Sequence, residues 1–109
     1  MKRGEIWSVA GGPDYAGKPR PAIILQSDQF DLTPSVTVCL LTGTHIPNVY
    51  ARFTIAPSAT NGLQTHSDVM VDKISTVPRV GVRRRIGQLD ASDLSILHQR
   101  IVLFLGLAD

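Results

Sequence analysis

The chain has 109 residues, of which 43% are hydrophobic and 18% are charged. This length suits one apolar core, so we expect a single domain over residues 1–109. Its apolar runs are far shorter than the roughly 20 residues of a membrane-spanning helix. A lone cysteine, Cys39, excludes a disulfide framework and a multi-cysteine zinc site. The N-terminus has no apolar stretch typical of a secretory signal, so we expect a soluble, cytoplasmic protein.

The net charge is only +2, but the basic residues are unevenly distributed. Arg79, Arg83, Arg84 and Arg85 lie close together with no acidic residue between them. Such a cluster suits a polyanionic partner. It equally suits a solvated edge strand whose charges prevent aggregation, and the sequence alone leaves both interpretations open.

Six short segments have the composition of β-strands and are separated by turn residues. They alternate in polarity or form short apolar runs, and several are rich in β-branched residues. The predicted strands cover residues 5–10, 22–26, 35–41, 51–56, 68–74 and 84–89.

The C-terminal segment changes to helical spacing. Leu94, Leu97, Ile101, Phe104 and Leu105 form one apolar stripe, and Asp90 is placed to cap the helix. Short strands followed by one amphipathic helix predict a mostly β protein, a small antiparallel barrel closed by the helix.

Most familiar catalytic motifs are missing. The chain has neither the glycine-rich phosphate loop with its lysine nor the serine elbow of the hydrolases. Its three histidines, His45, His66 and His98, do not have the spacing of metal ligands, so we expect no metal and no cofactor.

Two features suggest phosphate chemistry. Arg20 lies between Pro19 and Pro21, which hold its backbone rigid just before an apolar strand, although such a pair of prolines also occurs as simple strand punctuation. The segment 42–44, Thr-Gly-Thr, places hydroxyl groups at a strand end, where they suit a phosphate contact or a plain turn. His45, in the same turn, is a minor candidate.

Five segments, which follow one another in the same order along the chain, resemble one known family. They are Arg3-Gly4-Glu5-Ile6-Trp7, residues 20–28 (beginning Arg20-Pro21-Ala22-Ile23-Ile24), residues 36–42, residues 68–77 and Ile86-Gly87-Gln88-Leu89. Together they are similar to the MazF/PemK (Kid) toxins of bacterial type II toxin–antitoxin systems. The resemblance runs along the whole chain.

The resemblance implies an SH3-like barrel of the CcdB/MazF type with a C-terminal helix, acting as a homodimer. It also implies a metal-independent endoribonuclease that cuts single-stranded RNA, as mRNA, within short sequences. In such enzymes the ribose 2′-OH attacks the adjacent phosphate, leaving a 2′,3′-cyclic phosphate and a 5′-OH, and translation and growth stop. Arg20 and Thr42 match the catalytic arginine and threonine of the family. The residue that removes the 2′-OH proton stays open.

Some expectations about further site residues follow from the same resemblance. Met70 stands where some PemK/Kid members have an arginine, while Asp72 is retained, as a catalytic residue or as half of an ordinary ion pair. The residues we expect to bind RNA are Tyr15, Lys18, Thr44, His45, Arg79, Arg83 and Arg84.

The resemblance also implies a protein partner, an antitoxin whose acidic C-terminal tail covers the RNA groove. Arg20 and the arginines of residues 79–85 suit such a tail. An alternative is a non-enzymatic, CcdB-like toxin of the same fold that binds gyrase, and another is a barrel that binds RNA without cutting it.

Overall fold

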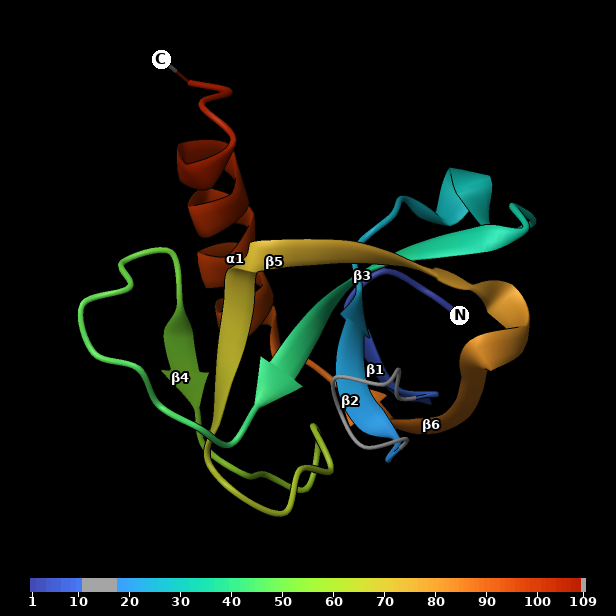
Figure 1. Ribbon diagram of the computed structural model, residues 1–109, viewed down its shortest axis with the longest axis horizontal. Coiled ribbons are helices and arrows are strands. Elements are labelled where there is room, and N and C mark those ends of the chain that lie inside the picture. Colours follow the sequence, from blue (N-terminus) through green and yellow to red (C-terminus); the bar gives the residue numbers. More distant parts are fainter. Residues whose placement is uncertain (11–17, 109) are drawn as a thin grey trace.

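The structure is a computed structural model, which describes residues 1–10 and 18–108. Six strands and one α-helix follow one another along the chain (Figure 1). They are β1 (Glu5–Val9), β2 (Arg20–Ile24), β3 (Ser35–Thr42), β4 (Phe53–Ile55), β5 (Ser67–Pro78), β6 (Val82–Gln88) and α1 (Ala91–Phe104). Two short 3-10 helices, η2 (Asp28–Phe30) and η3 (Arg79–Gly81), occupy connections between strands.

The strands form one antiparallel sheet in the order β4-β5-β3-β2-β1-β6. The mostly β fold class, the six predicted strands and the C-terminal helix are confirmed, with different bounds. β5 runs four residues past its predicted end because it pairs with β3 as far as Pro78, beyond its apolar segment. β4, at the sheet edge, keeps only three residues of its predicted strand.

β5 contains an irregularity that bends it sharply (Figure 1). Cys39 of β3 pairs with Ile74, whereas Leu41, two residues on, pairs with Val69. β5 therefore has extra residues at this point, as in a β-bulge, and such insertions bend a strand. The bend directs the two halves of β5 along different parts of β3.

One apolar core lies between the sheet and α1, which packs behind β5 in Figure 1. Its buried residues include Ile6, Ile23, Leu41, Val69 and Leu97. They alternate along the strands with residues of the other face, and Leu97 comes from the apolar stripe of the helix. α1 is the only α-helix among the described residues, and it is not long and apolar enough to cross a membrane.

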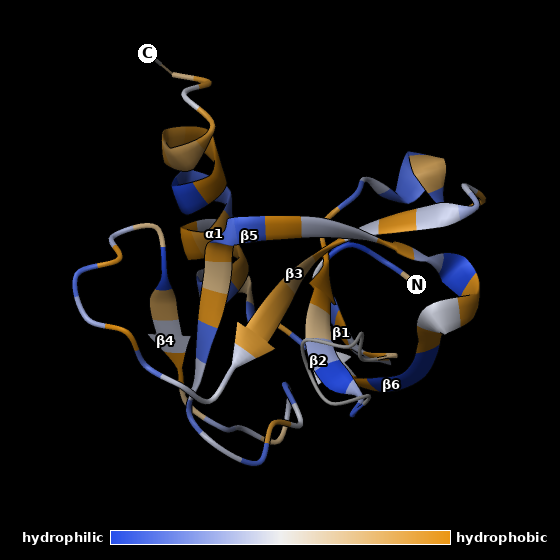
Figure 2. Cartoon of the chain, in the orientation of Figure 1, coloured by the Kyte–Doolittle hydropathy of each residue, from blue (hydrophilic) through white to orange (hydrophobic). Residues whose placement is uncertain are grey.

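A second core occupies the opposite face of the sheet. It gathers Val9, Ala22, Val38, Leu40 and Met70, with Trp7 and Val77 packed against it. Figure 2 shows that the start of β2 is hydrophilic while the rest of the strand is apolar. The second core thus ends at a polar margin where β2 begins and β3 ends.

The described sheet does not close into the expected barrel, since β4 and β6 are the two ends of its strand order and do not pair with each other. The connection from β4 to β5 packs against β6, where the Gln88 amide donates to the Thr60 carbonyl at 3.1 Å. A side chain at Gly87 would lie 2.4 Å from the Asn61 carbonyl oxygen. Glycine is therefore required where this loop meets β6.

The predicted helix start is confirmed in position only. Asp90 occupies the N-cap of α1, but its side chain makes no capping hydrogen bond among the described residues.

Candidate active site

Arg20 is the first residue of β2, where it pairs with Val9 of β1. Pro19 and Pro21 fix the backbone on both sides of it, so the guanidinium extends from a stiff base. An arginine keeps its positive charge at any physiological pH and offers several N–H donors in one plane. It is thus suited to hold a phosphate.

Arg20 lines a pocket of about 360 Å³. Two strands and a loop bring further polar side chains to it, namely Ser8 from β1, Arg84 from β6, and Gln64 and Thr65 from the loop before β5. Ser8 pairs with both Pro21 and Arg84, so β1 separates two arginine-bearing strands. The pocket has the positive charge and the hydrogen-bonding groups that a polyanion needs.

Thr42 ends β3 at the same margin of the sheet. Ala22 of β2 pairs with Leu40 of β3, and continuing that register by two residues brings Arg20 opposite Thr42. Thr42 pairs in turn with Asp68 of β5. Thr42 and Asp68 are thus direct neighbours across the strands, and Arg20 begins the next strand, although the described lining of the pocket includes Arg20 and not Thr42.

The Thr42 hydroxyl also shapes the turn that follows. It accepts a hydrogen bond from the Thr44 amide at 3.1 Å, which closes a tight turn after β3. His45 comes next, and its Nδ1 lies 2.8 Å from Oδ2 of Asp68. The turn therefore returns the chain toward β5.

Asp68 is a buried carboxylate that the sequence did not identify. Its side chain is 4% exposed, and Oδ1 accepts a hydrogen bond of 2.5 Å from the Thr54 hydroxyl of β4. Burial alone would raise the pKa of Asp68. The hydrogen bonds from Thr54 and His45, with the charges of His45 and Arg52, outweigh burial and hold that pKa below its usual value.

The sequence was compared with those of known proteins. Residues 2–105 match the family described as the PemK-like, MazF-like toxin of type II toxin-antitoxin systems. This chain belongs to that family.

The toxin has relatives that match it end to end. A probable endoribonuclease MazF of Mycolicibacterium smegmatis is 41% identical over 108 residues, covering 99% of both chains. The structure of the Mycobacterium tuberculosis toxin MazF-mt6 superposes with a TM-score of 0.77 at 28% identity, covering 94% of this chain and 96% of that one.

A third similar protein supports the fold. A mycobacterial endoribonuclease solved in complex with its cognate antitoxin gives a TM-score of 0.82 at 18% identity, covering 100% of this chain and 98% of that one. The expected family and fold are thus confirmed, and with them the toxin function and endoribonuclease class. These findings do not favour the alternative of a CcdB-like toxin that binds gyrase.

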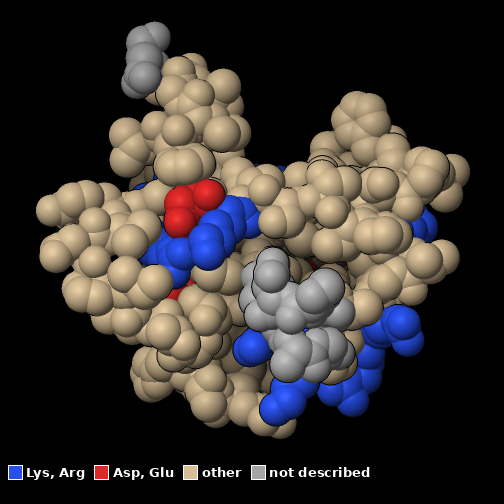
Figure 3. All heavy atoms as spheres, viewed as in Figure 1, with Lys and Arg blue, Asp and Glu red and all other residues tan. Residues whose placement is uncertain are grey.

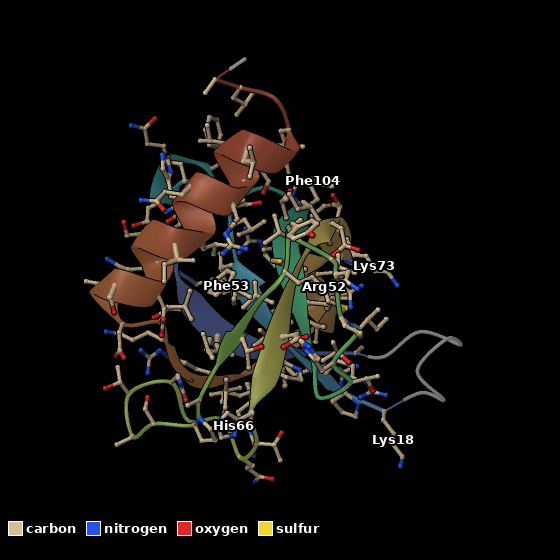
Figure 4. All side chains as sticks on the ribbon, turned by 90° about the vertical axis from the view of Figure 1, so that its left-hand side faces the viewer. Lys18, Arg52, Phe53, His66, Lys73 and Phe104 are labelled. Carbon is tan, nitrogen blue, oxygen red and sulfur yellow. The ribbon has the colours of Figure 1, made fainter. Side chains whose placement is uncertain are left out.

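Asp72 of the toxin forms an ion pair. The guanidinium of Arg52, which precedes β4, donates from Nε to Oδ1 at 2.8 Å and from Nη2 to Oδ2 at 3.1 Å. This hydrogen bonding, with the positive charge, lowers the pKa of Asp72 against the effect of burial. Figure 4 shows Arg52 on the side of the sheet away from α1, while Phe53 points toward the helix. Of the two interpretations, the structure supports the ion pair.

The predicted cationic cluster divides into two groups. Arg79 is tied into the fold through the Thr33 carbonyl at 2.7 Å, and Arg85 bonds Glu5 at 2.9 Å. Arg83 and Arg84 are exposed on β6. Figure 3 shows basic side chains gathered over this part of the sheet.

Three of the remaining RNA-binding candidates lie in described loops, one before β2 and two after β3. Lys18, Thr44 and His45 are exposed. Tyr15 lies outside the described residues. The sequence did not identify Asp68, because its hydrogen-bond partners Thr54 and His45 are distant from it in the chain. An acidic residue at the start of an apolar strand was the signal that could have identified it.

Proposed function

We propose that this toxin cuts single-stranded RNA without a metal ion and that Arg20 and Thr42 act on the scissile phosphate. The observation that carries the proposal is that Arg20 begins β2 and Thr42 ends the neighbouring antiparallel strand β3, beside a pocket lined by Arg20 and a second arginine, Arg84. Thr42 lies on β3, next to the strand that carries Arg20, and is not among the described residues that line the pocket. If a phosphate binds between Arg20 and Thr42, the pocket can therefore hold a neighbouring nucleotide.

In the proposed reaction the ribose 2′-oxygen attacks the adjacent phosphorus. The bond from phosphorus to the 5′-oxygen breaks, giving a 2′,3′-cyclic phosphate and a 5′-OH. Negative charge on the phosphate oxygens increases in the transition state, and Arg20 stabilises it through two parallel N–H donors. Thr42 holds a phosphate oxygen or orients the 2′-OH.

The substrate we propose is mRNA, whose cleavage stops translation and growth. Gln64 and Thr65, in the loop that lines the pocket, offer hydrogen-bonding groups for a base edge, and Arg84 offers charge for a flanking phosphate. Recognition by shape and base edges fits unpaired RNA, whose bases are accessible.

We further propose that the toxin forms a homodimer and binds an antitoxin through an acidic tail. A mycobacterial endoribonuclease of the same fold has been solved with its cognate antitoxin. In this chain the exposed Arg83 and Arg84 suit an acidic segment. Apolar side chains exposed at the end of α1, Leu103, Phe104, Leu105 and Leu107, offer area for protein contacts.

We assign the activity to one domain spanning residues 1–109 and place the protein in the cytoplasm, where its mRNA substrate is found. The family match over residues 2–105 supports the first assignment.

The test is cleavage of a long single-stranded RNA in EDTA, with mapping of the new ends. We expect discrete cuts that leave 5′-OH ends. Arg20→Ala is expected to lower the rate by about 10²- to 10³-fold, because it removes the main charge stabilisation. Lys2→Ala is the matched control, since it removes an exposed positive charge elsewhere. A folded Arg20→Ala protein with full activity contradicts the mechanism, and a requirement for a divalent ion contradicts metal independence.

A further inference from the structure

His45 and Asp68 form a dyad at the margin of the sheet where β2 begins and β3 ends. The two side chains are joined by a bond of 2.8 Å between Nδ1 and Oδ2. The histidine is 69% exposed, whereas the aspartate is 4% exposed. Thr54 fixes the other oxygen of the carboxylate from β4. One partner is therefore held in place inside the sheet, and the other faces solvent.

The dyad settles which nitrogen of His45 carries the hydrogen. The lowered pKa of Asp68 keeps this carboxylate ionised at neutral pH, and an ionised carboxylate only accepts hydrogen bonds. Nδ1 must then be the donor. In the neutral ring the lone pair lies on Nε2, as required of a nitrogen that accepts a proton.

The sheet brings this dyad beside the proposed reaction centre. Asp68 pairs directly with Thr42 at the end of β3, and Arg20 begins β2, the strand on the other side of β3. His45 lies only three residues beyond Thr42, in the turn that the Thr42 hydroxyl closes. A ribose whose phosphate binds Arg20 and Thr42 is therefore next to the imidazole.

We propose that His45 is the general base of the RNA cleavage, held in position by Asp68. This inference rests on the proposed function. Nε2 of His45 takes the proton of the ribose 2′-OH while the 2′-oxygen bonds to phosphorus. The bond from phosphorus to the 5′-oxygen breaks, and that oxygen takes a proton from water. The imidazolium then returns its proton to solvent, so protons balance over the cycle.

Other described groups near the margin are poor bases. Asp72 is occupied by two hydrogen bonds from Arg52, and a threonine hydroxyl does not accept a proton readily. Asp68 itself is buried behind His45. The charged groups at the dyad are Asp68 from β5 and Arg52 before β4, which acts on Asp68.

The experiment measures the single-turnover cleavage rate against pH, using an oligonucleotide that contains a mapped cut site. A general base must lose its proton before it can act, so for the unmodified toxin we expect the rate to rise with pH to a plateau. His45→Ala should lower the plateau rate by about 10²- to 10⁴-fold and abolish this rise. His98→Ala, which removes an exposed histidine of α1, is the matched control and should change neither.

Added imidazole provides a second readout. Because His45 is exposed, free imidazole can reach the space left in His45→Ala, and it should restore part of the rate. The same addition should not accelerate Arg20→Ala. A purely structural role of His45 predicts no such rescue.

The positioning residue Asp68 is tested with Asp68→Asn, which keeps the shape of the side chain. We expect a lower rate and a changed pH profile, since the carboxylate that holds His45 in position is lost. Thr54→Val gives a weaker effect of the same kind and replaces Asp68→Asn if that variant does not fold. Circular dichroism and thermal melting verify the fold of each variant.

The outcomes separate this proposal from the function on which it rests. If the unmodified toxin does not cut RNA, the proposed function fails. If it cuts and Arg20→Ala does not, but His45→Ala retains the rate or the pH rise, only the role of His45 is overturned. A loss confined to KM, without imidazole rescue, makes His45 an RNA-binding residue and likewise overturns the proposal.

Discussion

Arg52 and Asp72 join the start of β4 to the bend of β5 through two parallel hydrogen bonds. The Arg52 side chain is 6% exposed and that of Asp72 is 23% exposed, so the pair is largely shielded from water. Shielded ion pairs matter most when one partner is removed, because the other is left buried and uncompensated. Loss of either charge of this pair should therefore destabilise the fold.

We expect Asp72→Asn to lower the free energy of unfolding by about 2–3 kcal/mol, somewhat less than the cost of breaking a fully buried pair. Urea titration followed by circular dichroism measures the difference. Lys73→Ala is the control, because it removes the neighbouring exposed charge, and it should change stability by less than about 0.5 kcal/mol. Equal stability of Asp72→Asn and the unmodified chain contradicts a stabilising role for the pair.

The same pair makes stability depend on pH. The hydrogen bonds from Arg52 lower the pKa of Asp72 in the folded chain, so the unfolded chain binds this proton more readily. The contribution is complete above the ordinary aspartate pKa of about 3.9 and is lost as pH falls through the lower folded value. Urea midpoints between pH 2 and pH 6 should fall less steeply for Asp72→Asn.

Gly87→Ala should destabilise the chain by about 2–3 kcal/mol, as overpacking does. The new Cβ would lie 2.4 Å from the carbonyl oxygen of Asn61 and 2.6 Å from that of Thr60. Both are backbone atoms, which cannot move aside as easily as the end of a flexible side chain. Gly81→Ala is the matched control, since its Cβ would make an ordinary contact of 3.7 Å with Ala10. Thermal melts of both variants provide the comparison.

Cys39 should not react with thiol reagents while the chain is folded. Burial, together with the charge of Asp72, raises its pKa to about 12 against a smaller opposing effect of Arg52, and the side chain is 0% exposed. Only the thiolate reacts, so labelling by iodoacetamide at pH 8 should be at least about 1,000-fold slower than in urea. Rapid labelling of the folded chain would contradict this burial.

Arg84 and Arg79 should differ in how they affect RNA binding. Arg84 is exposed beside the pocket, so Arg84→Ala should weaken binding and reduce the slope of log affinity against log salt by about 0.7, the value for one single-strand phosphate contact. Arg79 is held by the Thr33 carbonyl, so Arg79→Ala should lower stability and leave the slope unchanged. Fluorescence anisotropy with the uncleavable 2′-deoxy form of the oligonucleotide measures both slopes. Equal slopes for the two variants contradict the distinction.

The strands and the helix were predictable because their signals are local. Val36, Val38 and Leu40 alternate along β3, and Leu94, Leu97 and Ile101 recur at helical spacing, whatever lies far away in the chain. Strand ends were less predictable. β5 continues to Pro78 because β3 offers it hydrogen bonds, and that partner is not visible in residues 75–78.

Part of the site was predictable for a different reason. Arg20 and Thr42 were selected by resemblance to the family before any geometry was known, and their catalytic roles stay predictions. The importance of Asp68 depends on three residues that meet only in the folded sheet, Thr42, His45 and Thr54. Asp72, by contrast, is a residue type that often acts as a catalytic acid, but in this structure its carboxylate is paired with Arg52.

The irregularity in β5 has a consequence for the chemistry. If the regular pairing at Cys39 and Ile74 continued along the two strands, Val71 would face Thr42, and no carboxylate would reach His45. The extra residues shift the strand so that Asp68 arrives there instead. A slip between these two strands would therefore separate His45 from its carboxylate partner. In the mechanism we propose, the general base depends on one pairing offset, which forms only when the sheet is assembled correctly.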